Sequence, residues 1–214
     1  YGGDYGAAKC IKDYFGQKPT DVRPLSDLAT TPKGFFAGSG NTTFGATTIG
    51  ANTRWVIYID GDLQINGDIT YSGSWTINEM PLLQVVVRGN IFIAPGVRNL
   101  HGTYIAQSDT SGNKGVIYTC ASSFNPPVLA GAPFASVCNN RLSVYGSFVA
   151  RDIEYLRVRG TLYISYANEN SVSNTASEVF NYSPAFWIAQ PNVRKANEGN
   201  ASKYDAITSL PPVL

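Results

Sequence analysis

Charged side chains are scarce in this chain. Asp, Glu, Lys and Arg make up 14% of its 214 residues, and the formal net charge at pH 7 is +1. Soluble proteins usually carry about a quarter of charged residues; here Gly, Ser, Thr, Asn and Tyr take their place, a composition typical of extracellular β-proteins. No basic tract or RNA-binding signature is present, which argues against nucleic acid as a partner.

Several other features are missing. No apolar run approaches the roughly 18 residues of a membrane-spanning helix, so we expect no membrane span in this chain. The start, Tyr1-Gly2-Gly3-Asp4, has neither a charged region nor the apolar run of a signal peptide. The chain also lacks an initiator Met, and we expect a piece of a longer exported protein whose signal and anchor lie elsewhere.

Glycine recurs midway between two bulky apolar residues that lie two positions away on either side. The six copies are centred on Gly61, Gly67, Gly89, Gly102, Gly146 and Gly160. Strand side chains alternate between faces, so the apolar pair and the glycine share one face. A glycine there leaves room for a sharp bend in the wall.

The spacing of these glycines indicates a repeat. Gly61 and Gly89 are 28 residues apart, and Gly89 and Gly146 are 57 apart, close to twice that distance. A fixed period is the mark of stacked units. We therefore predict an all-β fold, a parallel β-solenoid resembling a β-helix. The alternative is a β-sandwich or jelly roll in which the glycines mark bulges.

Three segments are expected along the chain. Residues 1–40 form an N-terminal cap or linker, partly helical, because apolar residues of Tyr5–Phe15 recur at helical spacing. Residues 41–190 form the solenoid domain, and residues 191–214 form a C-terminal tail. A cap is expected because an open solenoid end exposes core and strand edges.

The three cysteines suggest one disulfide bond within the chain. Cys120 and Cys138 flank a stretch rich in Pro, Ala and Ser that interrupts the strand pattern. A disulfide between them would close this excursion loop and stabilise the fold by about 3 kcal/mol. The alternative is two free, half-buried thiols. Cys10 would then pair with a cysteine upstream or remain buried and inert.

Metal and cofactor sites are not expected. Asp60, Asp62 and Asp68 crowd one outward face and offer the oxygen ligands that Ca²⁺ prefers. Their spacing matches neither an EF-hand nor a calcium-binding nonapeptide repeat, so we interpret them as solvated polar residues. The single histidine, His101, has no second histidine and no CxxC pair to complete a zinc site.

Catalytic machinery is weakly represented. Asp152 and Glu154 lie two residues apart on an expected strand and could act as a general acid and base. The neighbouring Arg151, Arg157 and Arg159 favour simple ion pairing instead. No GxSxG motif is present, and His101 has no nearby nucleophile, so a catalytic triad is not supported.

Aromatic side chains are the better functional candidates. Tyr58, Phe92, Tyr145 and Tyr163 all fall on the outward phase of their strands. Exposed rings offer a flat, partly polar surface to sugars or to a partner protein. The alternative is that loops or the C-terminal segment cover these rings.

Several segments resemble a known group of proteins. They are IYIDGDLQINGDITYSGSW, VVVRGNIFIAPGV, GTYIAQ, GVIYTC, NNRLSVYGSFVA, ASEVFNYSPAFWIAQP and YDAITSLPPVL. From about residue 41 onward the chain is similar to uncharacterised β-helix-like surface proteins of Saccharibacteria and related candidate-phyla bacteria. The resemblance implies a β-helix-like domain of a long exported protein, placed near pilus or adhesion functions, and it transfers no catalytic residue.

These observations predict a non-enzymatic, extracellular module of a bacterial envelope or pilus-associated protein, acting as a structural stalk or an adhesin-like binding domain. Its expected partners are a host-cell envelope protein or glycan, or other subunits of a surface assembly. The alternative is a carbohydrate-active enzyme of the parallel β-helix type, for which Asp152 and Glu154 are the nearest candidates.

Overall fold

The structure is a computed structural model that describes residues 13–109, 111–124, 137–158 and 176–183. Two sheets contain all of its strands. The nine-stranded sheet consists of β1 (Arg23–Pro24), β2 (Lys33–Ser39), β4 (Thr47–Ile49), β5 (Arg54–Asp60), β7 (Ile69–Tyr71), β8 (Leu82–Arg88), β10 (Asn99–Gln107), β12 (Leu142–Ala150) and β14 (Glu178–Asn181). The five-stranded sheet consists of β3 (Thr42–Phe44), β6 (Leu63–Ile65), β9 (Ile91–Ile93), β11 (Val116–Tyr118) and β13 (Asp152–Glu154).

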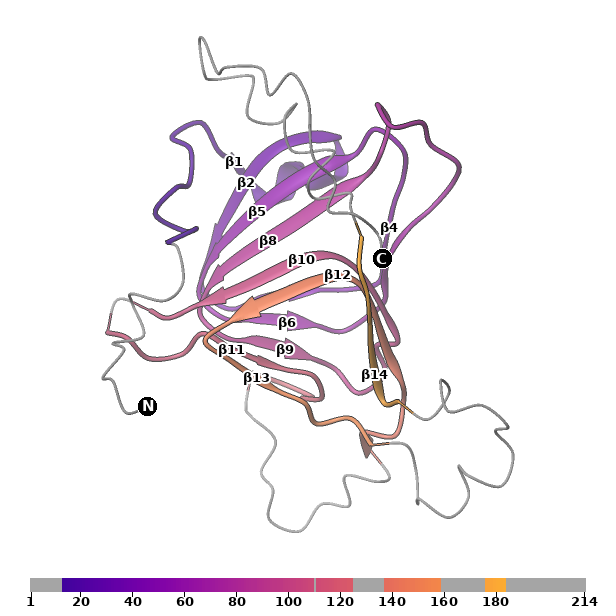
Figure 1. Ribbon diagram of the computed structural model, residues 1–214. Helices are drawn as coiled ribbons and strands as arrows, with labels where there is room; N and C mark the ends of the chain where they lie inside the picture. The colour runs from indigo at the N-terminus through magenta and orange to yellow at the C-terminus, as the bar shows by residue number, and fades with distance from the viewer. Residues whose placement is uncertain (1–12, 110, 125–136, 159–175, 184–214) are drawn as a thin grey trace, which may run out of the picture.

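Every pairing between these strands is parallel. The chain alternates between the two sheets. Each time it returns to the larger sheet it adds a strand beside the previous one, in the order β2, β5, β8, β10 and β12 (Figure 1). The all-β, parallel part of the prediction is confirmed. A sandwich or jelly roll would require antiparallel strands, so that alternative is wrong for the described residues.

The core consists of columns of apolar side chains that cross the strands. In one column Phe36 lies opposite Ile57, Ile57 opposite Val85, Val85 opposite Tyr104, and Tyr104 opposite Phe148. The first four are completely or almost completely buried. In-register parallel pairing thus converts the alternating pattern of each strand into one continuous apolar interior.

Parts of the outer surface of the nine-stranded sheet are also buried. Phe15 packs there against Tyr58, with ring centroids 6.0 Å apart, and its backbone N–H donates to Gln107 Oε1 at 2.7 Å. Val56, Val86 and Ile105 complete the buried part of this second apolar cluster. The segment before the first strand therefore covers a face that the alternating pattern alone would leave open to water.

The helix expected over Tyr5–Phe15 lies mostly outside the described residues, and its last three residues, 13–15, are not helical. Within residues 13–40 the one helical element described is η1 (Leu25–Ala29), a 3-10 turn. Leu25 and Leu28 of η1 pack against the main core. The assignment of residues 1–40 as a cap or linker stays a prediction.

Some of the motif glycines occupy bends between strands, whereas Gly102 and Gly146 lie inside β10 and β12. Gly61 and Gly89 follow β5 and β8 directly, at the passage from the larger sheet to the smaller one. A Cβ on Gly89 would collide with the carbonyl oxygen of Gly61, which follows β5, and one on Gly146 would collide with that of Gly102 in β10. Side chains are thus excluded by the neighbouring backbone rather than by a narrow interior. Gly160 lies outside the described residues.

The disulfide between Cys120 and Cys138 is present, which confirms the predicted pair. Their Cα atoms lie 5.9 Å apart and both side chains are buried. The bond joins the end of the β11 segment to the segment that leads into β12. Cys10 lies outside the described residues.

Candidate binding face

Two of the four aromatic residues expected to be exposed are buried. Tyr58 is 6% exposed because Phe15 covers it, and Phe92 is 1% exposed. Phe92 stacks on Tyr118 at 5.1 Å between centroids and makes a T-shaped contact with Phe124 at 6.2 Å. The expectation that these two rings form an open platform is therefore wrong.

Tyr145 differs from them, because 39% of it is exposed. Tyr163 lies outside the described residues. Tyr145 therefore remains the one candidate among the four whose described surroundings leave a ring open to a ligand, and the neighbours of that ring define the site.

Tyr145 belongs to a line of four aromatic rings that crosses the strands. Its ring centroid lies 4.6 Å from that of His101, which lies 5.0 Å from Tyr71, and Tyr71 lies 6.5 Å from Trp75. We call these four residues the ring row. It combines side chains from β12, β10, β7 and the loop after β7.

Strand register places these rings together. Tyr145 pairs directly with His101, and the neighbouring residue Leu100 pairs with Ile69 of β7. His101 and Tyr145 each precede the glycine of their five-residue unit. Aligning those units would therefore have indicated their contact from sequence. Tyr71 and Trp75 carry no such signal, because the placement of Tyr71 depends on the register of β7 with β10 and that of Trp75 on the path of the loop after β7.

The two ends of the ring row are accessible and its middle is fixed. Trp75 is 37% exposed, similar to Tyr145, whereas Tyr71 and His101 are partly buried. The hydroxyl of Tyr71 accepts a hydrogen bond from the backbone N–H of Leu83 at 2.7 Å. Burial raises the pKa of Tyr71 well above its usual value, so this phenol stays neutral.

His101 is also held in its neutral form. Burial lowers the pKa of its imidazole below the ordinary value of 6.5. Its ring contacts are both aromatic, and in the described part of the chain no carboxylate bonds to it. His101 therefore acts as a flat, uncharged spacer between two phenol rings and has no acidic partner of the kind that orients a catalytic histidine.

Beside the ring row, Tyr71 and Tyr145 border a recess of about 10 Å³ whose walls include Gly102, Gly146 and Ser183. That space suits about one water molecule. A ligand at this site would consequently lie across the rings and could not be enclosed.

The acidic pair on β13 gives no comparable site. Asp152 and Glu154 are both exposed, and Arg151 Nε donates to Asp152 Oδ2 at 2.9 Å. The expected ion pairing is thus confirmed for Arg151. It is wrong for Arg157, whose guanidinium is buried and donates to backbone carbonyls instead. Arg159 lies outside the described residues.

The three aspartates have separate partners. Asp60 pairs with Arg88, Asp62 with Lys114, and Asp68 accepts from the backbone N–H groups of Arg98 and Asn99. The hydrogen bond from Arg88 is the main cause that lowers the pKa of Asp60. Asp62 is buried, which corrects the expectation of a solvated residue. Across the described residues, no cluster of three His, Cys, Asp or Glu side chains could hold a metal ion.

No protein-family model, no curated protein and no solved structure matches this chain. The resemblance to candidate-phyla surface proteins therefore stays a prediction. Among the described residues, no helix has the length and apolar character needed to cross a membrane.

Proposed function

We propose that the strands form a parallel β-solenoid, with successive coils that begin with β2, β5 and β8. Three parallel ladders support this reading, because each coil adds one strand to each ladder in the same order. β10 contributes to two ladders, since Leu100 pairs with β7 and residues 103–107 pair with β8.

We propose that this solenoid is a non-enzymatic binding module of a bacterial surface protein. The observation that carries the proposal is the ring row, which presents two exposed rings, Trp75 and Tyr145, joined through Tyr71 and His101. Aromatic rings with polar edges suit the apolar faces and hydroxyl groups of a sugar. The proposed ligand is accordingly a glycan of another cell's envelope.

An extracellular location agrees with the disulfide. Cys120 and Cys138 are joined in the structure, and disulfides persist mainly in oxidising compartments. The low content of charged residues agrees with the same location. The sequence resemblance adds the expectation of a longer adhesin-like or pilus-associated protein.

The recess beside the ring row argues against an enclosed active site there. It is too small to hold a sugar, and the neutral His101 has no acidic partner among the described residues. Glycoside hydrolysis needs two carboxyl groups on opposite sides of the scissile bond. Asp152 and Glu154 instead lie on the same side of one strand, and Asp152 is engaged with Arg151.

A glycan array probed with the purified chain tests the proposal. Tyr145→Ala should weaken binding to the recognised glycan about three- to tenfold, because one ring contact is lost. Tyr155→Ala is the matched control, since Tyr155 is exposed but lies outside the ring row. Release of reducing sugar from the bound glycan, abolished by Glu154→Gln, would instead favour the carbohydrate-active enzyme.

A further inference from the structure

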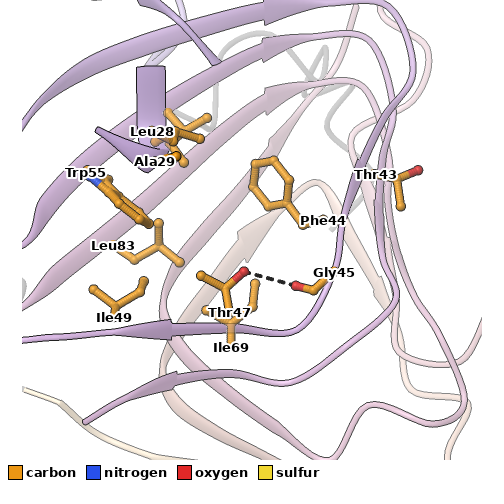
Figure 2. Close-up of a pocket in the computed structure, with 11 residues that line it drawn as sticks. Leu28, Ala29, Thr43, Phe44, Gly45, Thr47, Ile49, Trp55, Ile69 and Leu83 are labelled. Carbon is orange, nitrogen blue, oxygen red and sulfur yellow. Dashed lines mark hydrogen bonds between the residues drawn. The ribbon is translucent and has the colours of Figure 1, made fainter. Parts of the chain in front are cut away.

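A second candidate site lies beside the first strands of the two sheets. A cavity of about 280 Å³ opens between η1 and the β3–β4 turn (Figure 2). Ala29 at one side is exposed, whereas Ile57, Ile69 and Leu83 at the inner side are almost completely buried. The cavity therefore leads from the surface into the main core.

The walls of this cavity are apolar. Leu28, Phe44, Trp55 and Ile69 contribute side-chain surface, and no charged residue lines it. Two of the polar side-chain groups at its walls already have partners: Thr47 Oγ1 donates to the carbonyl of Gly45 at 3.1 Å. Trp55 Nε1 likewise donates to the carbonyl of Thr31 at 2.8 Å. An uncharged, apolar occupant is consequently favoured, because a polar group would lose its hydrogen bonds to water.

The volume limits the size of the occupant. A dry cavity of about 150 Å³ takes up benzene, and the space here is nearly twice as large. Protein interiors are otherwise close-packed, with few voids larger than a water molecule. The cavity thus suits one or two rings, or a branched aliphatic group of similar size.

The adjoining strand edges indicate how such a group would be presented. Among the described strands, β3 pairs only with β6, and β4 pairs only with β7. Thr47 N donates to Asp68 O, and Ile49 O accepts from Ser72 N. Since peptide groups alternate in direction along a strand, those of Thr48 face away from β7, where no described strand lies. The same argument applies to Thr43 in β3.

We propose that an extended peptide of a partner protein adds to the open edge of β4 and inserts a large apolar side chain into the cavity. Strand addition supplies backbone hydrogen bonds, and alternate side chains supply specificity. Ile49 points into the core, so a strand beside β4 directs every second side chain toward the same interior. The edge and the cavity thus form one peptide site, separate from the ring row.

The probe is the blocked peptide Lys-Thr-Val-Phe-Val-Thr-Lys, compared with the same peptide carrying Ala in place of Phe and with free toluene. Trp55 lines the cavity and provides a fluorescence signal. We expect the Phe peptide to bind at least tenfold more tightly than the Ala peptide. Equal affinity of the two peptides, no binding of either, or saturable binding of toluene without peptide binding would overturn the proposal.

Two variants separate the edge from the cavity. Thr48→Pro removes the outward N–H needed by an added strand, while proline is tolerated at such edge positions. Ala29→Phe blocks the mouth of the cavity. Each should weaken binding of the Phe peptide at least tenfold, whereas Thr48→Val and Ser26→Phe should leave it within about twofold. Ser26 lies on η1 outside the cavity lining. Unchanged affinity of the correctly folded Thr48→Pro protein would contradict strand addition.

Discussion

The Nε atom of Arg157 lies 2.6 Å from the carbonyl oxygen of Thr119, inside the protein. Its two terminal nitrogens donate to the carbonyls of Pro95 at 2.7 Å and Ala94 at 2.8 Å. One guanidinium therefore connects the segments that follow β9 and β11. Burial lowers the pKa of Arg157 to about 10, so the side chain is still charged at pH 7.

Replacing this residue should destabilise the fold strongly. An Arg157→Lys protein keeps the charge but loses the planar set of donors, which leaves buried carbonyls without partners. We expect the free energy of unfolding to fall by about 3 kcal/mol, measured by urea denaturation. Arg151→Lys serves as the control, since its exposed ion pair should contribute about 1 kcal/mol or less. Equal effects of the two changes would contradict this stabilising role of the Arg157 guanidinium.

Gly89 and Gly146 should not tolerate replacement by a residue with a branched side chain. Gly89→Val places a Cβ against the backbone of Gly61, and Gly146→Val places one against the backbone of Gly102. Each should lower the free energy of unfolding by roughly 1–3 kcal/mol through overpacking and strain. Gly96→Val is the matched control, because nothing lies within 4 Å of a Cβ there. Thermal melts that coincide for all three variants would remove the steric explanation.

The stability of the protein should depend on pH through His101. Its pKa is lowered on folding, so the unfolded chain binds more protons and stability rises with pH in this window. Stability should be lost as pH falls from about 6.5 toward the lowered value. The carboxyl groups of Asp60 and Asp68 also have lowered pKa values, but they act only below about pH 4.

His101→Phe should retain the ring contacts and abolish the dependence between about pH 6.5 and the lowered pKa. Urea midpoints measured from pH 7 to pH 5 provide the comparison. A slope that persists unchanged in His101→Phe would assign the effect to another group.

The disulfide should appear in the mass of the native protein. Reduction should add two hydrogen atoms for the Cys120–Cys138 bond. Replacing both cysteines by serine should lower the free energy of unfolding by about 3 kcal/mol, because the unfolded chain regains the freedom of the closed loop. Labelling of both thiols in the native, unreduced protein would contradict the bond.

The sequence was most informative where local spacing sets structure. Alternation and glycine position are local properties, so the core columns and the bends at Gly61 and Gly89 were predictable. Exposure was not, because it depends on segments distant in sequence. Phe15 covers Tyr58 from 43 residues away, and Phe124 packs on Phe92 from 32 residues away. No periodicity encodes such contacts.

The structural role of Arg157 could not be predicted from the sequence for a related reason. Its neighbours Asp152 and Glu154 suggested an ion pair along one strand, yet its actual partners are carbonyls up to 63 residues away. The ring row was partly accessible, since the paired positions of His101 and Tyr145 follow from the glycine units. Tyr71 joined it only through the register of β7 with β10.

The hydrogen bonds of the Arg157 guanidinium also affect how the protein would respond to tension. Backbone hydrogen bonds between parallel strands point along the direction in which the strands are stacked. A pull in that direction would part neighbouring strands one pair at a time, at low force. Arg157 holds the segments after β9 and β11 from a third position along the chain, and Cys120–Cys138 adds a covalent link beside it. The segments after β9 and β11 would therefore separate together under load. This part of the protein would be stiffer than the strands that only backbone hydrogen bonds hold together.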